Sequence, residues 1–303
     1  MATMPYAARS SAMAPSMVAS APPRHWPWFA PVVVLLLVVT LYPTGFVAWM
    51  SLHKSQYFEL REFVGLRNYA EALGSRDFRE ISWTSLLYVF GSLCLVGPIG
   101  LVAALVMNDI GRVGAALRVV GLLPWTLSMA VVGTIWLWIL NPSFGPLAYG
   151  LTNAGLSPGL MLGDPGVALL FVIVATVWWS FPYVMVMMTA ALQAVPKELY
   201  EAVEIDGGAT IAKLRYVTLP HIAPMLGSTL LALAILYLTL VTLIIVLTGG
   251  GPLGSTTTWS FDIFRQTVQA QNVAPAAAAS IIVLGINIAL GALYVRLTGR
   301  VSA

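Results

Sequence analysis

The residues best suited to chemistry are polar and aromatic side chains within one apolar segment, namely Thr176, Trp179, Ser180 and Tyr183. Their spacings of three, four and seven residues place them on one face of a helix. Hydroxyl, phenol and indole groups suit the binding of a neutral, hydroxyl-rich solute. Tyr237, in the next apolar segment, is a further candidate of this kind. The pattern favours a solute-lining role, and packing between membrane helices is the alternative.

The sequence lacks the residues that catalysis would need. A phosphate-binding loop requires Gly-Lys-Ser/Thr, but the lysines follow His53, Pro196 and Ala212. The three histidines lie far apart in the sequence, and no carboxylate pair lies within an apolar segment. We therefore expect no catalytic residue, no metal site and no cofactor in this chain. A proton- or sodium-driven carrier often has ionisable residues at mid-membrane, so their scarcity here also argues against that class.

The composition is that of an integral membrane protein. Hydrophobic residues make up 59% of the chain and charged residues 9%, and the mean hydropathy is +0.86. Several apolar segments reach the roughly 20 residues that a membrane-spanning helix needs. Because lipid leaves unpaired backbone groups unsatisfied, each span must be helical, and we expect an all-α protein. The six predicted spans cover residues 26–52, 81–107, 115–140, 167–192, 222–247 and 276–297.

Residues 1–24 are rich in Ala, Ser, Pro and Met, which predicts a flexible tail ahead of a single membrane domain at 25–300. The first apolar segment is too long for a typical signal-peptide core, so we expect it to be retained as a span. No basic run with interleaved aromatic residues occurs, and nucleic acid is not an expected partner.

The distribution of basic residues predicts the orientation of the chain, because cytoplasmic loops carry an excess of lysine and arginine. If both termini are cytoplasmic, six basic residues lie outside: Lys54, Arg61, Arg67, Arg76, Arg79 and Arg265. The other nine lie inside: Arg9, Arg24, Arg112, Arg118, Lys197, Lys213, Arg215, Arg296 and Arg300. This bias places the charged segment 196–220 in the cytoplasm.

Segment 196–220 reads as a helix, a glycine turn and a second helix. Pro196 suits the first turn of a helix, and Gly207-Gly208 is a helix stop that permits a left-handed conformation. We expect the second helix to run over 210–217 and to end at Pro220.

The same segment resembles the coupling loop of ABC importer permeases, Glu-Ala-Ala-x-x-x-Gly followed by Ile-x-Leu-Pro. Here the motif reads Glu201-Ala202-Val203, Gly207 and Val217-Thr218-Leu219-Pro220, so valine replaces the second alanine and the isoleucine. In that family the loop forms a cytoplasmic coupling helix between spans four and five, which docks on an ATPase subunit. The resemblance assigns this role to Glu201, Ala202, Asp206, Gly207, Leu219 and Pro220.

Three further stretches resemble the maltose-permease group: residues 177–183 with 191–196, residues 63–69, and residues 248–252. The resemblance implies sugar contacts at Thr176, Trp179, Ser180, Tyr183 and Tyr237. This sequence departs from the group at residues 240–243, where a polar pair is usual and Leu-Val-Thr-Leu stands instead.

The resemblance implies a six-span type I permease in a bacterial inner membrane that imports a sugar. It also implies three kinds of partner: a second six-span permease, two ATPase subunits that bind ATP and Mg, and an extracytoplasmic solute-binding protein. A glycerol phosphate, a phosphodiester or another polyol is the alternative solute. A secondary carrier without ATPases and a non-transporting scaffold are the alternative classes, and neither accounts for the coupling motif.

Overall fold

The computed structural model describes residues 26–109, 111–155, 159 and 161–298, so the predicted tail at 1–24 lies outside the described residues. The chain divides into two compact units, residues 1–45 and 46–303. Residues 26–45 of the first unit belong to helix α1 (Trp26–Ser51), whose apolar side chains, such as Trp28 and Leu35, are largely exposed. This apolar, exposed surface is what a helix facing lipid requires, and it agrees with the predicted first span.

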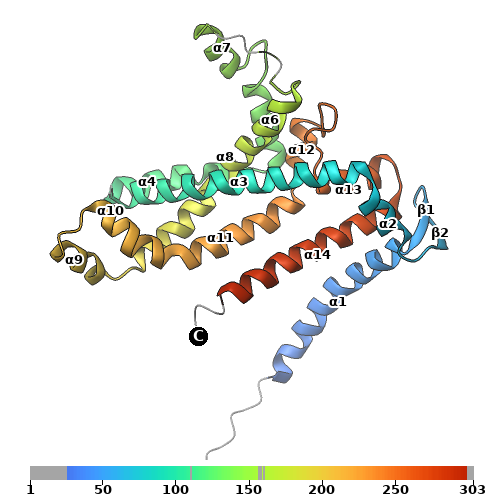
Figure 1. Ribbon diagram of the computed structural model, residues 1–303, viewed down its shortest axis with the longest axis horizontal. Helices are drawn as coiled ribbons and strands as arrows, with labels where there is room; N and C mark the ends of the chain where they lie inside the picture. Colours follow the sequence, from blue (N-terminus) through green and yellow to red (C-terminus); the bar gives the residue numbers. More distant parts are fainter. Residues whose placement is uncertain (1–25, 110, 156–158, 160, 299–303) are drawn as a thin grey trace, which may run out of the picture. The chain divides into compact units, whose positions relative to one another are not determined.

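The second unit is built around long apolar helices. Helix α3 (Arg76–Asp109) packs along α8 (Pro165–Gln193), and α11 (Leu219–Thr239) packs against both and against α14 (Val273–Thr298), as Figure 1 shows. Pro98 and Pro182 lie inside continuous helices, so neither ends a span. Fully buried Tyr88, Val96 and Met185 lie in the core between these helices. These helices and α1 are long and apolar enough to cross a membrane, and they overlap the predicted spans one, two, four and six.

The segment predicted as the third span, 115–140, is divided among three helices and bends sharply. The chain forms α4 (Gly111–Gly121), α5 (Leu123–Thr126) and α6 (Met129–Ile139), and residues 116–126 and 129–139 meet at 96°. Pro124 cannot extend α4, and the Ser128 side chain caps the first turn of α6, so a new helix direction starts there. By length and composition, the described residues hold five candidate spans, or six if this bent pair is one span.

The observed helices also differ from the predicted fifth span, 222–247, at both ends. Helices α10 (Thr210–Ala212), π-helical η1 (Lys213–Thr218) and α11 follow one another without a break, so Pro220 does not end a helix. Pro220 directly follows the π-helical turn, and the helix continues through it. At the other end, extended Leu240 separates α11 from α12 (Thr242–Leu247), which packs on α6.

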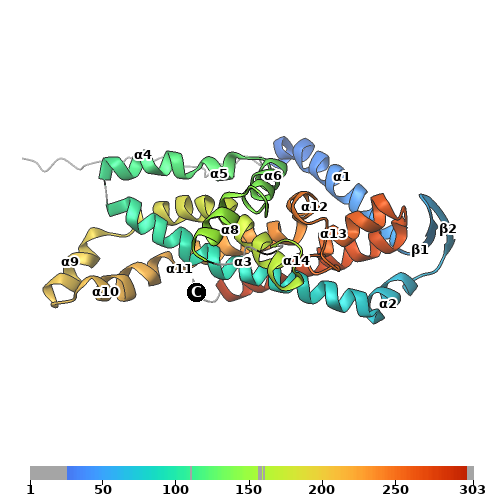
Figure 2. The same cartoon turned by 90° about the horizontal axis from the view of Figure 1, so that it is seen from above.

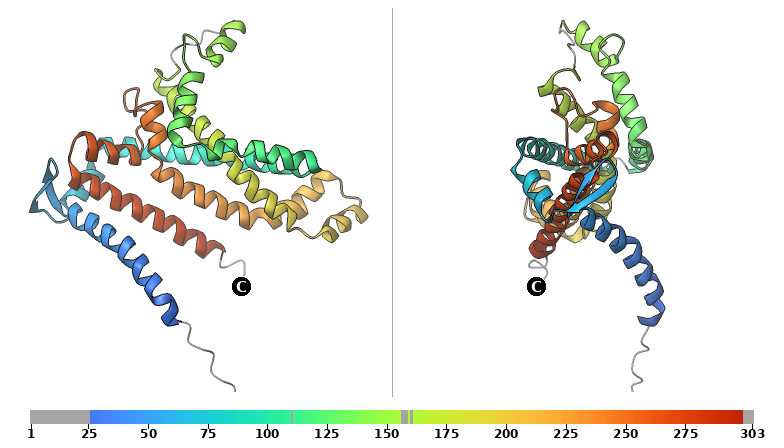
Figure 3. Two further views of the ribbon diagram at one scale, coloured as in Figure 1. Left: turned by 180° about the vertical axis from the view of Figure 1, so that it is seen from behind. Right: turned by 90° about the vertical axis from the view of Figure 1, so that its right-hand side faces the viewer.

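Several short elements were not predicted. A hairpin of β1 (His53–Gln56) and β2 (Glu59–Phe63) precedes α2 (Arg67–Gly74), and α7 (Pro146–Asn153) lies in the loop after α6. Helices α13 (Trp259–Phe264) and π-helical η2 (Arg265–Gln269) precede α14. The hairpin lies at the opposite end of the unit from α9 (Lys197–Ile205), as Figures 2 and 3 show.

Candidate functional site

A cluster of four hydroxyl groups joins the three central helices. Tyr88 of α3 lies 3.1 Å from the Thr176 hydroxyl of α8, and Tyr237 of α11 lies 2.5 Å from the Ser180 hydroxyl of α8. Thr176 donates to the Val172 carbonyl and Ser180 donates to the Thr176 carbonyl. Because each of those hydroxyls has one proton, the two tyrosines must be the donors to Thr176 and Ser180.

This hydroxyl cluster is closed within the chain. Thr176 and Ser180 are 0% exposed and Tyr237 is 1% exposed. The structure thus brings three of the predicted path residues together and gives each a protein partner. To reach Ser180 and Tyr237 a solute would have to separate α11 from α8, and to reach Thr176 it would have to displace Tyr88 of α3. Their predicted contact with solute stays a prediction, and the visible role of the cluster is to hold α3, α8 and α11 together.

Trp179 and Tyr183 lie in a second, aromatic cluster. Both rings pack against Trp125 of α5: the Trp179 ring is tilted at a centroid distance of 4.3 Å, and the Tyr183 ring is stacked at 5.0 Å. The Trp179 indole N–H donates to the Leu127 carbonyl at the bend between α5 and α6. Trp125 and Tyr183 are half-buried, so part of each ring surface remains accessible.

The four predicted residues of α8 therefore divide into two pairs with different neighbours. Thr176 and Ser180 contact α3 and α11, whereas Trp179 and Tyr183 contact α5. Sequence reasoning missed Trp125, because the bend between α5 and α6 was not predicted. The Pro124-Trp125 pair inside that apolar segment is the signal that could have revealed it.

Helix α9 ends in a glycine-dependent turn. Gly207 has a φ of +77°, in the left-handed region. The Gly208 N–H donates to the Val203 carbonyl at 2.8 Å, and the Gly207 N–H donates to the Glu204 carbonyl at 3.0 Å. This pair of hydrogen bonds defines a Schellman motif, which confirms the predicted glycine stop.

The surface of α9 has one side packed inward and one side exposed. Leu199, Tyr200 and Val203 pack against the core. The predicted coupling residues lie on the other side or beyond the helix, and all are exposed: Glu201, Ala202, Asp206, Gly207, Leu219 and Pro220. The structure therefore leaves all six predicted coupling residues accessible to a partner.

Exposed apolar side chains accompany these residues, and sequence reasoning did not single them out. Ile205 is 86% exposed, Ile211 is 79% exposed and Tyr216 is 68% exposed. Acidic residues beside exposed isoleucines form a mixed surface, which is typical of protein–protein contacts. In a helix with one buried side, an isoleucine at a position on the exposed side is the signal that could have identified them.

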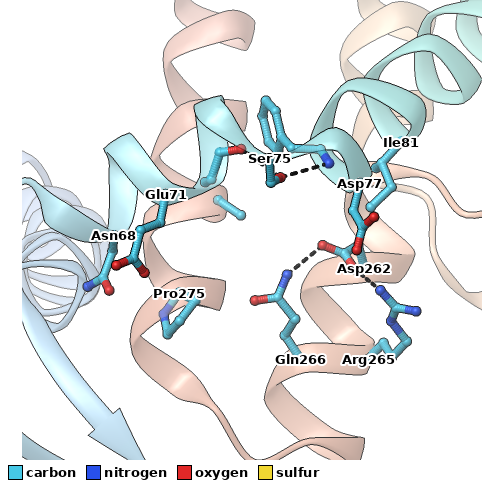
Figure 4. Close-up of a pocket in the computed structure, with 12 residues that line it drawn as sticks. Asn68, Glu71, Ser75, Asp77, Ile81, Asp262, Arg265, Gln266 and Pro275 are labelled. Atoms are coloured by element: carbon cyan, nitrogen blue, oxygen red, sulfur yellow. Dashed lines mark hydrogen bonds and ion pairs between the residues drawn. The ribbon is translucent and has the colours of Figure 1, made fainter.

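A polar pocket lies at the hairpin end of the bundle, between α2, α3, α13, η2 and α14. Its volume is about 180 Å³, and Figure 4 shows its lining residues. Asp262 is only 6% exposed and accepts hydrogen bonds from Arg265 at 2.6 Å and Gln266 at 2.5 Å. At the rim, the hydrogen bond from Arg67 to Glu71 raises the pKa of the Arg67 guanidinium. The buried carboxylate thus anchors the start of η2.

Comparison with known proteins gives a consistent picture. Residues 97–303 match the family described as "Binding-protein-dependent transport system inner membrane component". The chain is 34% identical to the trehalose/maltose transport system permease protein of Thermococcus litoralis, over 78% of this chain and 80% of that protein. It is 28% identical to the sn-glycerol-3-phosphate transport system permease protein of Yersinia pestis, over 89% of this chain and 92% of that protein.

A solved structure shares the fold. The chain resembles one from a bacterial alginate ABC transporter in complex with an alginate pentasaccharide-bound periplasmic protein, with a TM-score of 0.79. The similarity covers 92% of this chain and 96% of that chain at 21% sequence identity. This likeness shows that the chain shares its overall fold with that transporter chain.

Proposed function

Because the chain belongs to the family of binding-protein-dependent transport system inner membrane components, whose members are non-enzymatic ABC permease subunits, we propose that it forms part of an ATP-driven sugar importer. The observation that carries this proposal is the α9 segment, an exposed, Schellman-capped helix with Glu201 and Asp206 on its accessible surface. The related permease named for trehalose and maltose supports a sugar as the solute.

The partners follow from this assignment. The family's description includes a binding protein. We propose further that a second six-span permease completes the path and that two ATPase subunits bind ATP and Mg. In this arrangement α9 and both termini lie in the cytoplasm, where an ATPase reaches Glu201, and the hairpin end faces the binding protein.

The aromatic cluster is the proposed first contact for the sugar within this chain. Half-buried rings such as Trp125 and Tyr183 offer flat apolar faces to the C–H faces of a sugar ring, and Tyr183 adds a hydroxyl. Ser180 and Tyr237 then become available when α11 separates from α8 during transport, and Thr176 when Tyr88 of α3 releases it. Neither the hydroxyl cluster nor the aromatic cluster includes a charged side chain, which suits a neutral solute.

A glycerol phosphate is the second candidate solute, because a relative of similar coverage is named for it. A phosphate would require compensating cations along the path. The two clusters supply none, so the second permease would have to provide them.

The test is ATP-dependent uptake by the complex purified from native membranes and reconstituted in proteoliposomes. Radiolabelled maltose, trehalose, a monosaccharide and glycerol 3-phosphate are compared at equal concentration, with the co-purified binding protein present. Saturable uptake of a sugar that requires ATP supports the proposal. Uptake of glycerol 3-phosphate alone would replace the sugar assignment, and recovery of the chain without any ATPase would refute the importer.

A further inference from the structure

We propose that Tyr200 and Thr218 are positioning residues that join α9 to the π-helical start of α11, so that α9 and α11 move together during transport. The Tyr200 hydroxyl lies 3.1 Å from the Thr218 hydroxyl, and Lys213 forms an ion pair with Glu204. Each contact connects α9 with η1. The inference rests on the proposed coupling function of α9. It adds the contacts through which a movement of α9 reaches α11.

The direction of the hydrogen bond follows from the π-helical geometry. The Thr218 hydroxyl donates to the carbonyl of Lys213, five residues earlier, at 3.3 Å. Its proton is therefore in use, and Tyr200 must donate to Thr218. Thr218 is 4% exposed, so this bond lies in a protected environment, where a missing partner is costly. The Thr218 hydroxyl therefore bonds both to the π-helical turn, through the Lys213 carbonyl, and to α9, through the Tyr200 hydroxyl.

The packing around α9 is uneven. Among the described elements, η1 is the one that α9 contacts most. A cavity of about 530 Å³ lies between α9 and η1 on one side and the ends of α3 and α8 on the other. Its lining includes Leu105, Leu192, Tyr200 and Thr218. Close contact on one side and open space on the other allow α9 and η1 to shift as one body relative to α8.

The far end of the same helix reaches the hydroxyl cluster. Residues 210–239 form one helical run, and Tyr237 near its end donates to Ser180 of α8. A displacement passed from Tyr200 to Thr218 is therefore carried to the contact that closes α11 against α8. Two polar contacts, one at each end of the helical run, connect the α9 surface with the interior of the bundle.

The experiment measures sugar molecules taken up per ATP hydrolysed, in proteoliposomes that contain the complete complex. Tyr200→Phe and Thr218→Val each remove the hydrogen bond, while Thr218→Ser keeps it. Since such a bond contributes about 0.5–1.5 kcal/mol, we expect the uptake per ATP to fall about 2- to 10-fold in the first two variants. We expect Thr218→Ser to retain the ratio of the unmodified chain.

Three controls separate linkage from other effects. Co-purified ATPase is expected to remain constant in all variants, because the exposed side of α9 is unchanged. Tyr149→Phe removes an exposed hydroxyl from α7, outside α9, η1 and both clusters, and is expected to leave the ratio unaltered. The Tyr200→Phe/Thr218→Val double variant is expected to match the single variants, because both lose the same bond.

Unchanged uptake per ATP in both hydrogen-bond variants would overturn the linkage, and so would losses that multiply in the double variant. Loss of the ATPase from Tyr200→Phe would assign Tyr200 to docking and would also overturn it. Failure of the proposed function gives a different result, because the unmodified complex would then show no ATP-dependent uptake at all.

Discussion

The conformation of Gly207 makes a sharp prediction about the α9 turn. An added Cβ at Gly207 would meet no atom within 4 Å, so space does not require glycine there. The φ of +77° does require glycine, because L-residues with a side chain rarely adopt this conformation. Gly207→Val and Gly207→Asn therefore form a matched pair. Both add a side chain of similar size in open space, but asparagine tolerates the left-handed conformation and a β-branched residue does not.

The size of the effect follows from the backbone strain alone. Holding a non-glycine residue in the left-handed region costs about 1–3 kcal/mol, and valine belongs at the upper end. A cost of 1.4 kcal/mol corresponds to a tenfold change in population, so the native turn would be reduced about 5- to 150-fold by valine. For asparagine we expect a cost below about 1 kcal/mol and a reduction of less than about 5-fold.

Gly208 supplies a contrasting mechanism. Its added Cβ would overlap the Val203 side chain and lie 2.9 Å from the Val203 carbonyl oxygen. Gly208→Ala should therefore disrupt the Schellman hydrogen bond to Val203 although Gly208 lacks a positive φ. We expect it to be more harmful than Gly207→Ala, which adds the same methyl group without a clash.

The assay is the amount of ATPase that co-purifies with each variant, normalised to the permease in the membrane, together with ATP-dependent uptake. The expected order of activity is unmodified chain, Gly207→Asn, Gly207→Ala and Gly207→Val. Equal activities of the valine and asparagine variants, at equal membrane levels, would refute the reasoning that the left-handed turn positions α9.

Four further predictions concern single side chains. Glu201→Lys reverses an exposed charge on α9 and should abolish ATPase co-purification without loss of membrane insertion, whereas retained ATPase would exclude Glu201 from docking. Trp125→Ala should raise the sugar concentration for half-maximal uptake about 2- to 10-fold, in line with the strength of aromatic contacts, and Trp125→Phe should largely restore it. Tyr237→Phe should destabilise the protein by about 0.5–1.5 kcal/mol in detergent unfolding, because the donor to Ser180 is lost, and an unchanged midpoint would contradict that hydrogen bond. Asp262→Ala should cost about 1.5–3 kcal/mol, because two hydrogen bonds to a buried carboxylate are lost, and protease cleavage near η2 measures the loosening.

Features set by local physics could be read from the sequence. Uninterrupted apolar segments long enough to cross a membrane predicted α1, α3, α8 and α14, because length and hydropathy alone decide which segments can be spanning helices. The end of α9 followed from Gly207-Gly208, since only glycine adopts the left-handed conformation without cost. The exposure of Glu201 and Asp206 followed from their charge.

Features that depend on the packing of neighbouring helices could not be read from the sequence. Pro124 and Ser128 mark where the chain turns after α5, but the 96° direction of α6 also depends on its packing against α12, a helix more than 100 residues later in the sequence. Pro220 was expected to end a helix, but the π-helical turn before it accommodates the ring. A local rule about proline therefore gave the wrong boundary, because the surrounding packing supports a continuous helix.

The same division applies to the candidate site. The sequence by itself determined which residues on α8 carry hydroxyl and aromatic groups, and the helical period determined that they recur along one side. Only the tertiary structure decided that Thr176 and Ser180 meet tyrosines of α3 and α11 while Trp179 and Tyr183 meet Trp125. A helix repeats every 3.6 residues and so fixes the direction of each side chain from its axis. The groups that lie in that direction belong to segments far away in the chain, and their positions depend on the packing of the whole bundle.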